Sequence, residues 1–334
     1  MTTTLARSAS RRLRQESSRL FVIRELGIVA ALTLLVVVTT IVNPRFLTSQ
    51  GIKDLLLGST ILAILAVGQT VVVITRNVDL SAGSVLGLSA FATGSLFVAA
   101  PGLPIPVAVV AGVLLGAACG AVNGGLIAAV QVPSLVVTLG TLYVFRGIDY
   151  TWASGRQINA ADMPGAFLSM GNTTPVMTMF AIVVLVAAGY YLRAFRSGRE
   201  LYAIGSHPDA ARLAGIPVGR RVLAAFVVSG ALAGLAGVLY AARFGTLDAN
   251  AGTGLELNVV AAVVVGGVAI FGGSGSVYGA AIGALLLTTI GSALPALGVS
   301  PFWQRASVGA LILAAIGLDR ALAVRLARTL RSGR

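Results

Sequence analysis

The sequence of 334 residues contains a single lysine, and this scarcity excludes one class of site. A phosphate-binding P-loop has the pattern GxxxxGK followed by Ser or Thr, because the lysine reaches the phosphates of the nucleotide. Lys53 lies in Gly-Ile-Lys-Asp-Leu-Leu, which does not have that pattern. Gly273, Gly275 and Gly279 miss the GxGxxG spacing by one residue. We therefore expect this chain to bind no ATP and no other cofactor.

Cysteine and histidine are equally scarce. The one cysteine, Cys119, lies in an apolar run, so a disulfide within the chain is excluded and a cysteine-based metal site is not expected. The one histidine, His207, lies in a polar segment and forms no HExxH pattern. Since the sequence offers neither a metal cluster nor a nucleophile paired with a base, we expect no catalytic residues and disfavour a membrane enzyme.

Charged residues are also few, at 10% of the chain, whereas soluble domains have about 25%. Hydrophobic residues make up 57%, and the mean hydropathy is +0.93. These values indicate a polytopic membrane protein in a lipid bilayer. The net charge of +13 comes from arginines at both termini and in one central segment, with apolar runs between them. This is the positive-inside distribution and not a basic face that binds nucleic acid.

Apolar runs close to the length of a membrane-spanning helix, about 20 residues, recur along the chain. They cover residues 26–42, 55–75, the stretch that ends at about 100, 107–130, 135–152, 176–192, 222–242, 257–271, 277–297 and 302–318. The expected fold is therefore all-α with about ten transmembrane helices, and eight spans plus re-entrant segments would keep the same parity. Both Arg-rich termini then lie in the cytoplasm. We expect a cytoplasmic tail at 1–25, one transmembrane domain at 26–318 and a second cytoplasmic tail at 319–334.

The polar segment at residues 193–221 is strongly basic. It must lie outside the membrane, because a charged residue at the bilayer centre costs at least about 2.5 kcal/mol. Six spans precede it, so it shares the cytoplasmic side with the termini. Within it, His-Pro-Asp at 207–209 begins a helix well and Gly-Ile-Pro at 215–217 ends one well. The sequence therefore predicts a short helix between these two signals, with a small apolar face.

Residues 76–84, Arg-Asn-Val-Asp-Leu-Ser-Ala-Gly-Ser, interrupt the apolar runs after the second span. They are rich in side chains that cap helix N-termini. Two interpretations stay open. The stretch is either a plain turn before a capped helix or a discontinuous helix that lines a path, since irregular backbone at membrane depth survives only beside protein or water.

Two other spacings indicate structure rather than chemistry. Glycines recur at every fourth position of the fourth span, at residues 112, 116, 120 and 124. They line one helix face and predict close packing against another helix. Arg146 and Asp149 are three residues apart, which favours a structural ion pair over a contact with a solute. For Glu256 and Asn258 we likewise favour a structural role over a contact with a solute.

The spans contain no ladder of carboxylates of the kind that ion-driven transporters use. If the chain moves a solute uphill, the energy must therefore arrive through a partner. The alternative is a stand-alone secondary transporter or channel for a small polar solute, which proton- or sodium-dependent uptake by this chain alone would favour.

Several blocks of sequence follow one another in a recognisable order. Residues 77–84 are similar to a G-I-D-L-S-V-G-S signature, and 140–148 to a GTLxxxRG stretch. Residues 198–216 are similar to a central cytoplasmic loop, and 251–275 to AGTGYEL and glycine-rich blocks. Together they resemble the permease subunits of ribose-type bacterial ABC importers, over nearly the whole chain. Arg-Asn at 76–77 and Ser-Pro-Phe-Trp at 300–303 are closest to the rhamnose-type or autoinducer-2-type permeases.

The resemblance implies one translocation path formed by a homodimer, or by a heterodimer with a sister permease, in the bacterial inner (plasma) membrane. It implies a cytoplasmic ABC ATPase subunit that binds ATP and magnesium, and an extracytoplasmic sugar-binding protein. The cargo would be a monosaccharide, rhamnose-like or another simple sugar, or autoinducer-2. The resemblance also implies that the cytoplasmic segment at 193–221 is the coupling segment, with a coupling helix at about 206–215 that sits in a groove of the ATPase. The expected ATPase-coupling residues are Arg199, Glu200, His207, Asp209, Ala210, Leu213 and Gly215. The candidates for lining the path are Asn77, Asp79, Ser81, Ser84, Arg146, Glu256 and Asn258.

Overall fold

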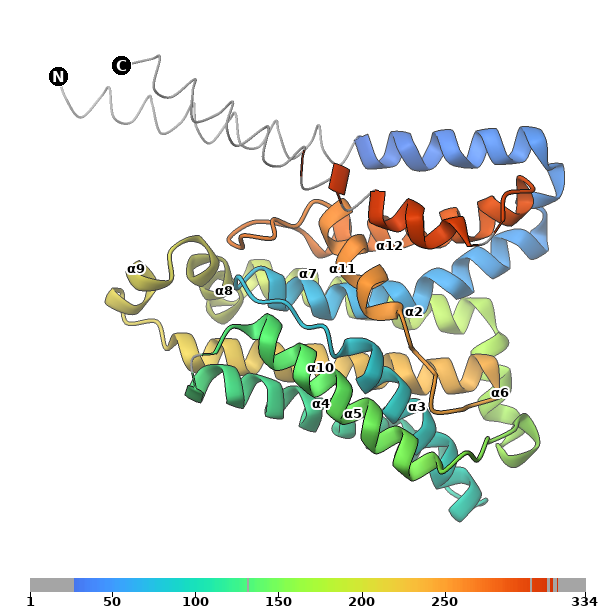
Figure 1. Ribbon diagram of the computed structural model, residues 1–334, viewed down its shortest axis with the longest axis horizontal. Helices are drawn as coiled ribbons and strands as arrows, with labels where there is room; N and C mark the ends of the chain where they lie inside the picture. Colours follow the sequence, from blue (N-terminus) through green and yellow to red (C-terminus); the bar gives the residue numbers. More distant parts are fainter. Residues whose placement is uncertain (1–26, 131, 301, 311–312, 315–316, 318–334) are drawn as a thin grey trace.

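The computed structural model describes residues 27–130, 132–300, 302–310, 313–314 and 317. Within this part of the chain the fold is all-helical, as predicted, and it contains one isolated β-bridge, between Ile158 and Leu247 (Figure 1). The predicted terminal tails lie outside the described residues, and so does much of the last predicted span.

Six of the described helices are long and apolar enough to cross a membrane. They are α2 (Ser49–Val73), α3 (Ala82–Ala99), α4 (Ile105–Val130), α7 (Thr174–Ala194), α10 (Val218–Phe244) and α12 (Val277–Ala296). A seventh long helix, α5 (Ser134–Ala153), is less apolar because it carries Arg146 and Asp149. The expected count of ten spans and the cytoplasmic position of the termini stay predictions.

The remaining helices are short. They are the segment Gly27–Val42, α6 (Gly165–Asn172), α8 (Arg196–Ser206), α9 (Pro208–Leu213) and α11 (Leu255–Val265), with 3-10 turns η1 (Pro44–Leu47) and η2 (Ala160–Asp162). Helices α8 and α9 lie at one end of the bundle, and α6 lies at the opposite end (Figure 1). The two ends therefore differ in structure, with a pair of short helices projecting from only one of them.

Three predicted boundaries are wrong, for local reasons. Helix α2 begins at Ser49 and not at residue 55, because the Thr48 hydroxyl accepts a hydrogen bond from Gly51 N and starts the helix earlier. The predicted polar loop at 154–175 contains α6. The eighth predicted span stops at Val265 and not at 271, because Gly267 adopts a positive φ of 94° and the chain turns there.

The predicted packing role of the glycine stripe on α4 is confirmed, and its partner is α10. A Cβ at Gly116 would lie 2.2 Å from Gly230 O, and a Cβ at Gly120 would lie 2.2 Å from Phe226 O. A Cβ at Gly230 would in turn lie 2.2 Å from Gly116 O. The two backbones therefore approach so closely that only glycine fits at the crossing points.

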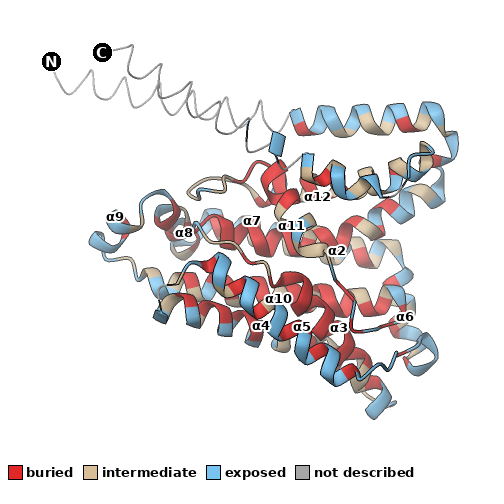
Figure 2. Cartoon of the chain, viewed as in Figure 1, coloured by how far each residue is buried: buried red, intermediate tan, exposed pale blue. Residues whose placement is uncertain are grey.

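Helix α2 lies at the centre of the bundle and packs against α7, α10, α11 and α12. It is largely buried, as are α3 and most of α10, whereas α4 and α7 expose much of their apolar surface (Figure 2). In a membrane protein such an exposed apolar face is in contact with lipid or with another subunit. The polar side chains described next lie in the buried centre.

Candidate functional site

The predicted break between the second and third spans is present. Helix α2 ends at Val73 and α3 begins at Ala82, and Arg76 between them has a φ of 65°, in the left-handed region. The backbone of the break is satisfied by side chains of α5. Val78 N donates to Ser134 Oγ at 3.1 Å, and Thr138 Oγ1 donates to Val78 O at 3.2 Å. The break is thus a non-helical segment that is buried at Asp79 and Ser81 and partly exposed at residues 76–78, in keeping with irregular backbone that lies beside protein or a cavity.

Asp79 is the centre of a buried polar network in this break, with only 2% of its surface exposed. Its Oδ1 accepts from Ser81 N at 2.9 Å and from Ser81 Oγ at 2.7 Å, and its Oδ2 accepts from Ser229 Oγ of α10 at 3.4 Å. When the amide of Gln69 in α2 is oriented with nitrogen toward Asp79 O, both of its atoms bond the Asp79 backbone, at 3.1 and 3.2 Å. Asp79 therefore joins α2, the break and α10.

The network continues into α4 and α5. Asn123 Nδ2 donates to Ser81 Oγ at 2.8 Å, and Thr141 Oγ1 donates to Asn123 Oδ1 at 2.6 Å. Ser84 Oγ donates to Ser81 O at 2.8 Å within the first turn of α3. Asp79, Ser81 and Ser84 are all enclosed in this conformation, where they hold helices together. That they line a path stays a prediction.

Arg146 is buried, and its guanidinium donates hydrogen bonds to backbone carbonyl groups. Its Nη1 donates to Ala249 O at 2.9 Å and to Ala251 O at 2.7 Å, and it lies 3.9 Å from Asp149 Oδ2. Arg146 thus fixes the turn that leads into α11 and is paired with Asp149, the structural arrangement that the spacing favoured. The carboxylate of Glu256 faces the same turn, since its Oε1 accepts from Gly254 N at 3.2 Å.

The first turn of α3 and this turn before α11 meet in the interior. A Cβ at Gly83 would lie 2.7 Å from Gly252 O and 2.4 Å from Glu256 Oε2, and one at Gly87 would lie 2.3 Å from Ala251 O. Helix α11 has 11 residues, a length of about 16 Å, against a hydrocarbon core of about 30 Å. Two discontinuous helices that start side by side inside a membrane protein are the usual frame of a solute path.

The predicted coupling segment forms two helices, α8 and α9, and the first of them was not foreseen. The C-terminus of α8 is held against the break. Arg76 Nε donates to Gly205 O and Arg76 Nη2 donates to Ser206 O at 2.8 Å. Gly273 N donates to Ile74 O at 2.9 Å, so the turn before α12 joins the same contact. The C-terminus of α8 is therefore bonded directly to the segment that carries Asp79.

The side chains of Glu200 and Arg199 in α8 form hydrogen bonds with other groups of this chain. Glu200 is 7% exposed and accepts from Arg221 Nε at 2.6 Å and from Arg196 Nε at 2.9 Å. The hydrogen bond from Arg221 and the second one from Arg196 hold the pKa of the Glu200 carboxyl below its usual range. Arg199 Nη1 donates to the carbonyls of Arg193 and Ala194. Glu200 ties α8 to the start of α10.

Helix α9 carries the exposed part of the coupling segment. His207 stands at its N-cap, Asp209 and Arg212 form an exposed ion pair at 3.1 Å, and Gly215 follows the helix with a φ of 78°. Ala210 is exposed, and Leu213 exposes 91% of its surface. Ala210, Leu213 and Ala214 together give α9 a small exposed apolar surface.

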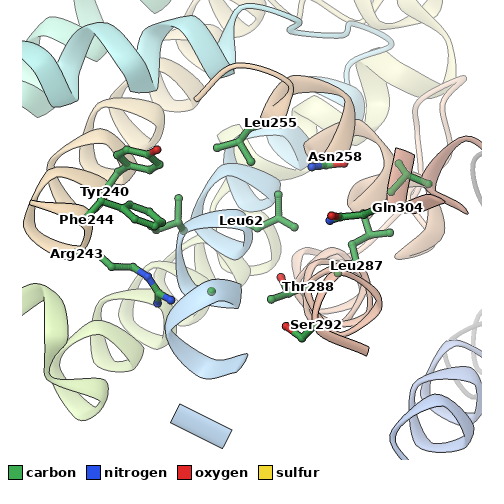
Figure 3. A pocket seen from close by; sticks show the side chains of 14 residues that line it. Leu62, Tyr240, Arg243, Phe244, Leu255, Asn258, Leu287, Thr288, Ser292 and Gln304 are labelled. Atoms are coloured by element: carbon green, nitrogen blue, oxygen red, sulfur yellow. The ribbon is translucent and has the colours of Figure 1, made fainter. Parts of the chain in front are cut away.

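Two cavities border these elements. One of about 860 Å³ is lined by Arg76, Asn77 and Val78 of the break, together with Ile204 and Arg212 of the coupling helices. The other, of about 290 Å³, lies between α2, α10, α11 and α12 (Figure 3). Its polar lining consists of Tyr240, Arg243, Asn258, Thr288, Ser292 and Gln304. Asn77 thus lines the larger of these two cavities and Asn258 lines the smaller one.

Sequence reasoning missed several polar residues of the interior. Gln69, Asn123 and Ser229 bond the predicted residues Asp79 and Ser81, yet none of the three belongs to a recognised motif. Thr141 belongs to the GTLxxxRG stretch, but its bond to Asn123 was not predicted. The signal that identifies them is the cost of placing an amide or hydroxyl within a span without a partner. Arg243 falls outside the predicted span at 222–242, although it belongs to the last turn of α10.

Comparison with known proteins gives a consistent result. A family model described as the permease component of branched-chain amino acid transport systems matches residues 51–316. The chain is 36% identical to the autoinducer 2 import system permease protein LsrC of Escherichia coli (strain K12 / DH10B) over 310 residues, which cover 92% of this chain and 90% of the relative. It is also 36% identical to the ribose import permease protein RbsC of Escherichia coli (strain K12) over 316 residues, which cover 92% and 96%. No solved structure matches significantly.

Proposed function

This chain belongs to the family of permease components of ATP-binding-cassette importers, and on that premise we propose that it carries a monosaccharide or autoinducer-2 across the bacterial inner membrane. As such a component it is a transport subunit without an ATPase site of its own. Family membership favours this function over the stand-alone secondary transporter or channel. Rhamnose-like and other simple sugars stay open as cargo, since the two relatives import different molecules.

The proposed topology has ten spans within one transmembrane domain at 26–318, with cytoplasmic tails at 1–25 and 319–334. Helices α8 and α9 then lie in the cytoplasm, whereas α6 and the loop between α10 and α11 lie outside. The arrangement in Figure 1 supports this, because these two groups occupy opposite ends of the bundle. The arginines of the 193–221 segment favour the cytoplasmic assignment of the first group.

The observation that carries the coupling role is the exposure of Leu213 on a short helix whose neighbour is bonded to the break. We propose that α9 docks into a groove of a cytoplasmic ABC ATPase, which binds ATP and magnesium. Leu213, Ala210 and Asp209 would make the contact, while Arg199 and Glu200 would keep α8 in place. Motion of the ATPase would then reach the break through Arg76.

The remaining partners follow from the same premise. An extracytoplasmic sugar-binding protein would deliver the cargo to the outer end of the bundle. A second copy of this chain, or a sister permease, would complete the path, and the exposed apolar surfaces of α4 and α7 offer room for lipid and for that subunit.

The test is ATP hydrolysis by the complex of the permease with a cytoplasmic ABC ATPase subunit. The purified permease should hydrolyse no ATP, and it should stimulate the ATPase. Leu213→Asp should abolish the stimulation while the permease still inserts, because a buried carboxylate opposes docking into an apolar groove. Ala161→Asp, at an exposed site of η2, is the control and should change nothing. Normal stimulation in Leu213→Asp would overturn the assignment of α9.

A further inference from the structure

The cavity of about 290 Å³ is lined by one cation, Arg243, whose guanidinium carbon lies 5.5 Å from the centroid of the Phe244 ring. Arg243 Nη1 is buried and forms no hydrogen bond within the described part of the chain. None of the fourteen residues that line the cavity is acidic. The side chain as a whole is only partly buried, but a buried N–H group without an acceptor costs free energy, so this donor beside a cavity favours a ligand that supplies acceptor oxygens.

The lining has two different sides. Tyr240, Arg243 and Phe244 of α10 lie on one side, and Asn258, Thr288, Ser292 and Gln304 lie on the other, with Leu62 of α2 between them (Figure 3). The rings of Tyr240 and Phe244 are 4.3 Å apart between centroids and form an aromatic wall. An aromatic wall, a guanidinium fork and several amides and hydroxyls form a lining suited to a ligand with many hydroxyl groups and an apolar ring face.

The position of the cavity also fits a solute that enters from outside. Arg243 is in the last turn of α10, Asn258 is in the first turn of α11, and Ser292 is near the end of α12. In the proposed topology all three lie in the extracytoplasmic half of the membrane. The cavity therefore lies on the side from which the cargo arrives.

We propose that this cavity is the outer binding site for a small polyhydroxylated solute of monosaccharide size, with Arg243 as the donor that fixes its hydroxyl oxygens. The inference deepens the proposed function and rests on it for the direction of entry. It adds Arg243, Thr288, Ser292 and Gln304 to the residues that recognise the cargo.

The test uses a single cysteine as a reporter, because the one native cysteine, Cys119, is buried. In a Cys119→Ala background, Ser292→Cys is treated in intact cells with the anionic reagent MTSES and the cationic reagent MTSET. We expect labelling by both, with MTSES favoured several-fold by the nearby guanidinium. Arg243→Gln should abolish this preference. Ser169→Cys, on the exposed surface of α6, is the control site whose labelling should not respond to Arg243.

The ligand class is tested by protection with D-ribose, D-xylose and L-rhamnose at millimolar concentration. At least one of them should slow the labelling of Ser292→Cys several-fold without affecting Ser169→Cys. Arg243→Lys keeps the positive charge but loses the parallel N–H donors of the guanidinium. This variant should therefore keep the preference for MTSES and lose the protection by sugars. Asn258→Ala should give the same result, and it replaces the arginine variants if these do not reach the membrane.

Three results would overturn the proposal. The first is the absence of labelling at Ser292→Cys while Ser169→Cys is labelled. The second is labelling that none of the three sugars slows, including the case in which only inorganic phosphate slows it. The third is protection that persists in Arg243→Lys and Asn258→Ala. Because the labelling requires neither ATP nor a binding protein, intact protection without ATP-coupled uptake would contradict the proposed function and leave the site standing.

Discussion

Asn123 of α4 donates through Nδ2 to Ser81 Oγ across 2.8 Å, and this bond connects a helix with an exposed apolar face to the buried start of α3. The same amide accepts from Thr141 Oγ1 of α5 at 2.6 Å. Asn123 is fully buried, so neither partner has water as a substitute. A single side chain thus fixes the relative positions of α3, α4 and α5 next to Asp79.

Replacing Asn123 should therefore destabilise the protein and reduce transport. Asn123→Ala leaves two buried hydroxyls short of a partner and should lower stability by about 1–3 kcal/mol. Asn172→Ala is the control, because Asn172 is exposed and bonds only Leu168 O. The measurement is the temperature at which the detergent-solubilised protein loses its monodisperse elution peak. Equal melting of both variants would show that the network carries no stability.

The contact between α4 and α10 gives a second prediction. Gly120→Val should destabilise the fold by about 1–3 kcal/mol or more, because the new Cβ would lie 2.2 Å from Phe226 O. Gly125→Val is the matched control on the same helix, since a Cβ there has no atom within 4 Å. Thermal melting in detergent checks the pair. Similar losses in both variants would mean that the helices do not cross at Gly120.

The sequence predicted the features that depend on residues close together in the chain, and it did not predict contacts between distant segments. The glycine spacing at 112–124 predicted a close helix contact, because small residues at every fourth position have few other uses. It did not identify α10 as the partner, because Gly230 and Gly234 lie more than 100 residues away. Likewise the 76–84 break followed from its polar residues, whereas its attachment to α8 depends on a left-handed Arg76 that no local pattern requires.

The candidate site was only partly accessible to sequence reasoning for the same reason. Asp79 and Ser81 stood in a motif, and the structure places them in one network. Arg243 belongs to no recognised motif, and an arginine at the end of an apolar span is usually a membrane-interface residue. Only the cavity beside it and the missing partner of its Nη1 distinguish it.

Arg76 provides a prediction about coupling. Both Arg76→Ala and Arg76→Gly remove the bonds to Gly205 and Ser206 of α8. They should keep ATPase binding and stimulation through α9 but lose most of the solute uptake. Glycine adopts the positive φ of this position without the strain, about 1–3 kcal/mol, that alanine retains, so Arg76→Gly should be the more stable variant.

The measurement is the ratio of solute uptake to ATP hydrolysis in proteoliposomes that contain the complete transporter. Arg45→Ala, which removes an exposed arginine at the other end of α2, should keep the wild-type ratio. An unchanged ratio in both Arg76 variants would show that force does not pass through this contact.

Glu200 gives a prediction about pH. Its folded-state pKa is lowered mainly by the hydrogen bond from Arg221. A lowered carboxyl pKa stabilises the folded state at pH values above the unfolded pKa, about 4.3 for Glu, and this contribution is lost as the pH falls through the folded pKa. Glu200→Gln should therefore melt at a lower temperature than the wild type between pH 5 and pH 8, by a nearly constant difference, because Glu200 stays ionised over that whole window. Below about pH 4 the wild-type advantage should shrink as the carboxylate becomes protonated.

Asp209→Asn, which breaks an ion pair whose carboxylate is 92% exposed, should melt close to the wild type at neutral pH. A difference between Glu200→Gln and the wild type that grows on acidification would contradict the assignment of Glu200 as the anion that ties α8 to α10.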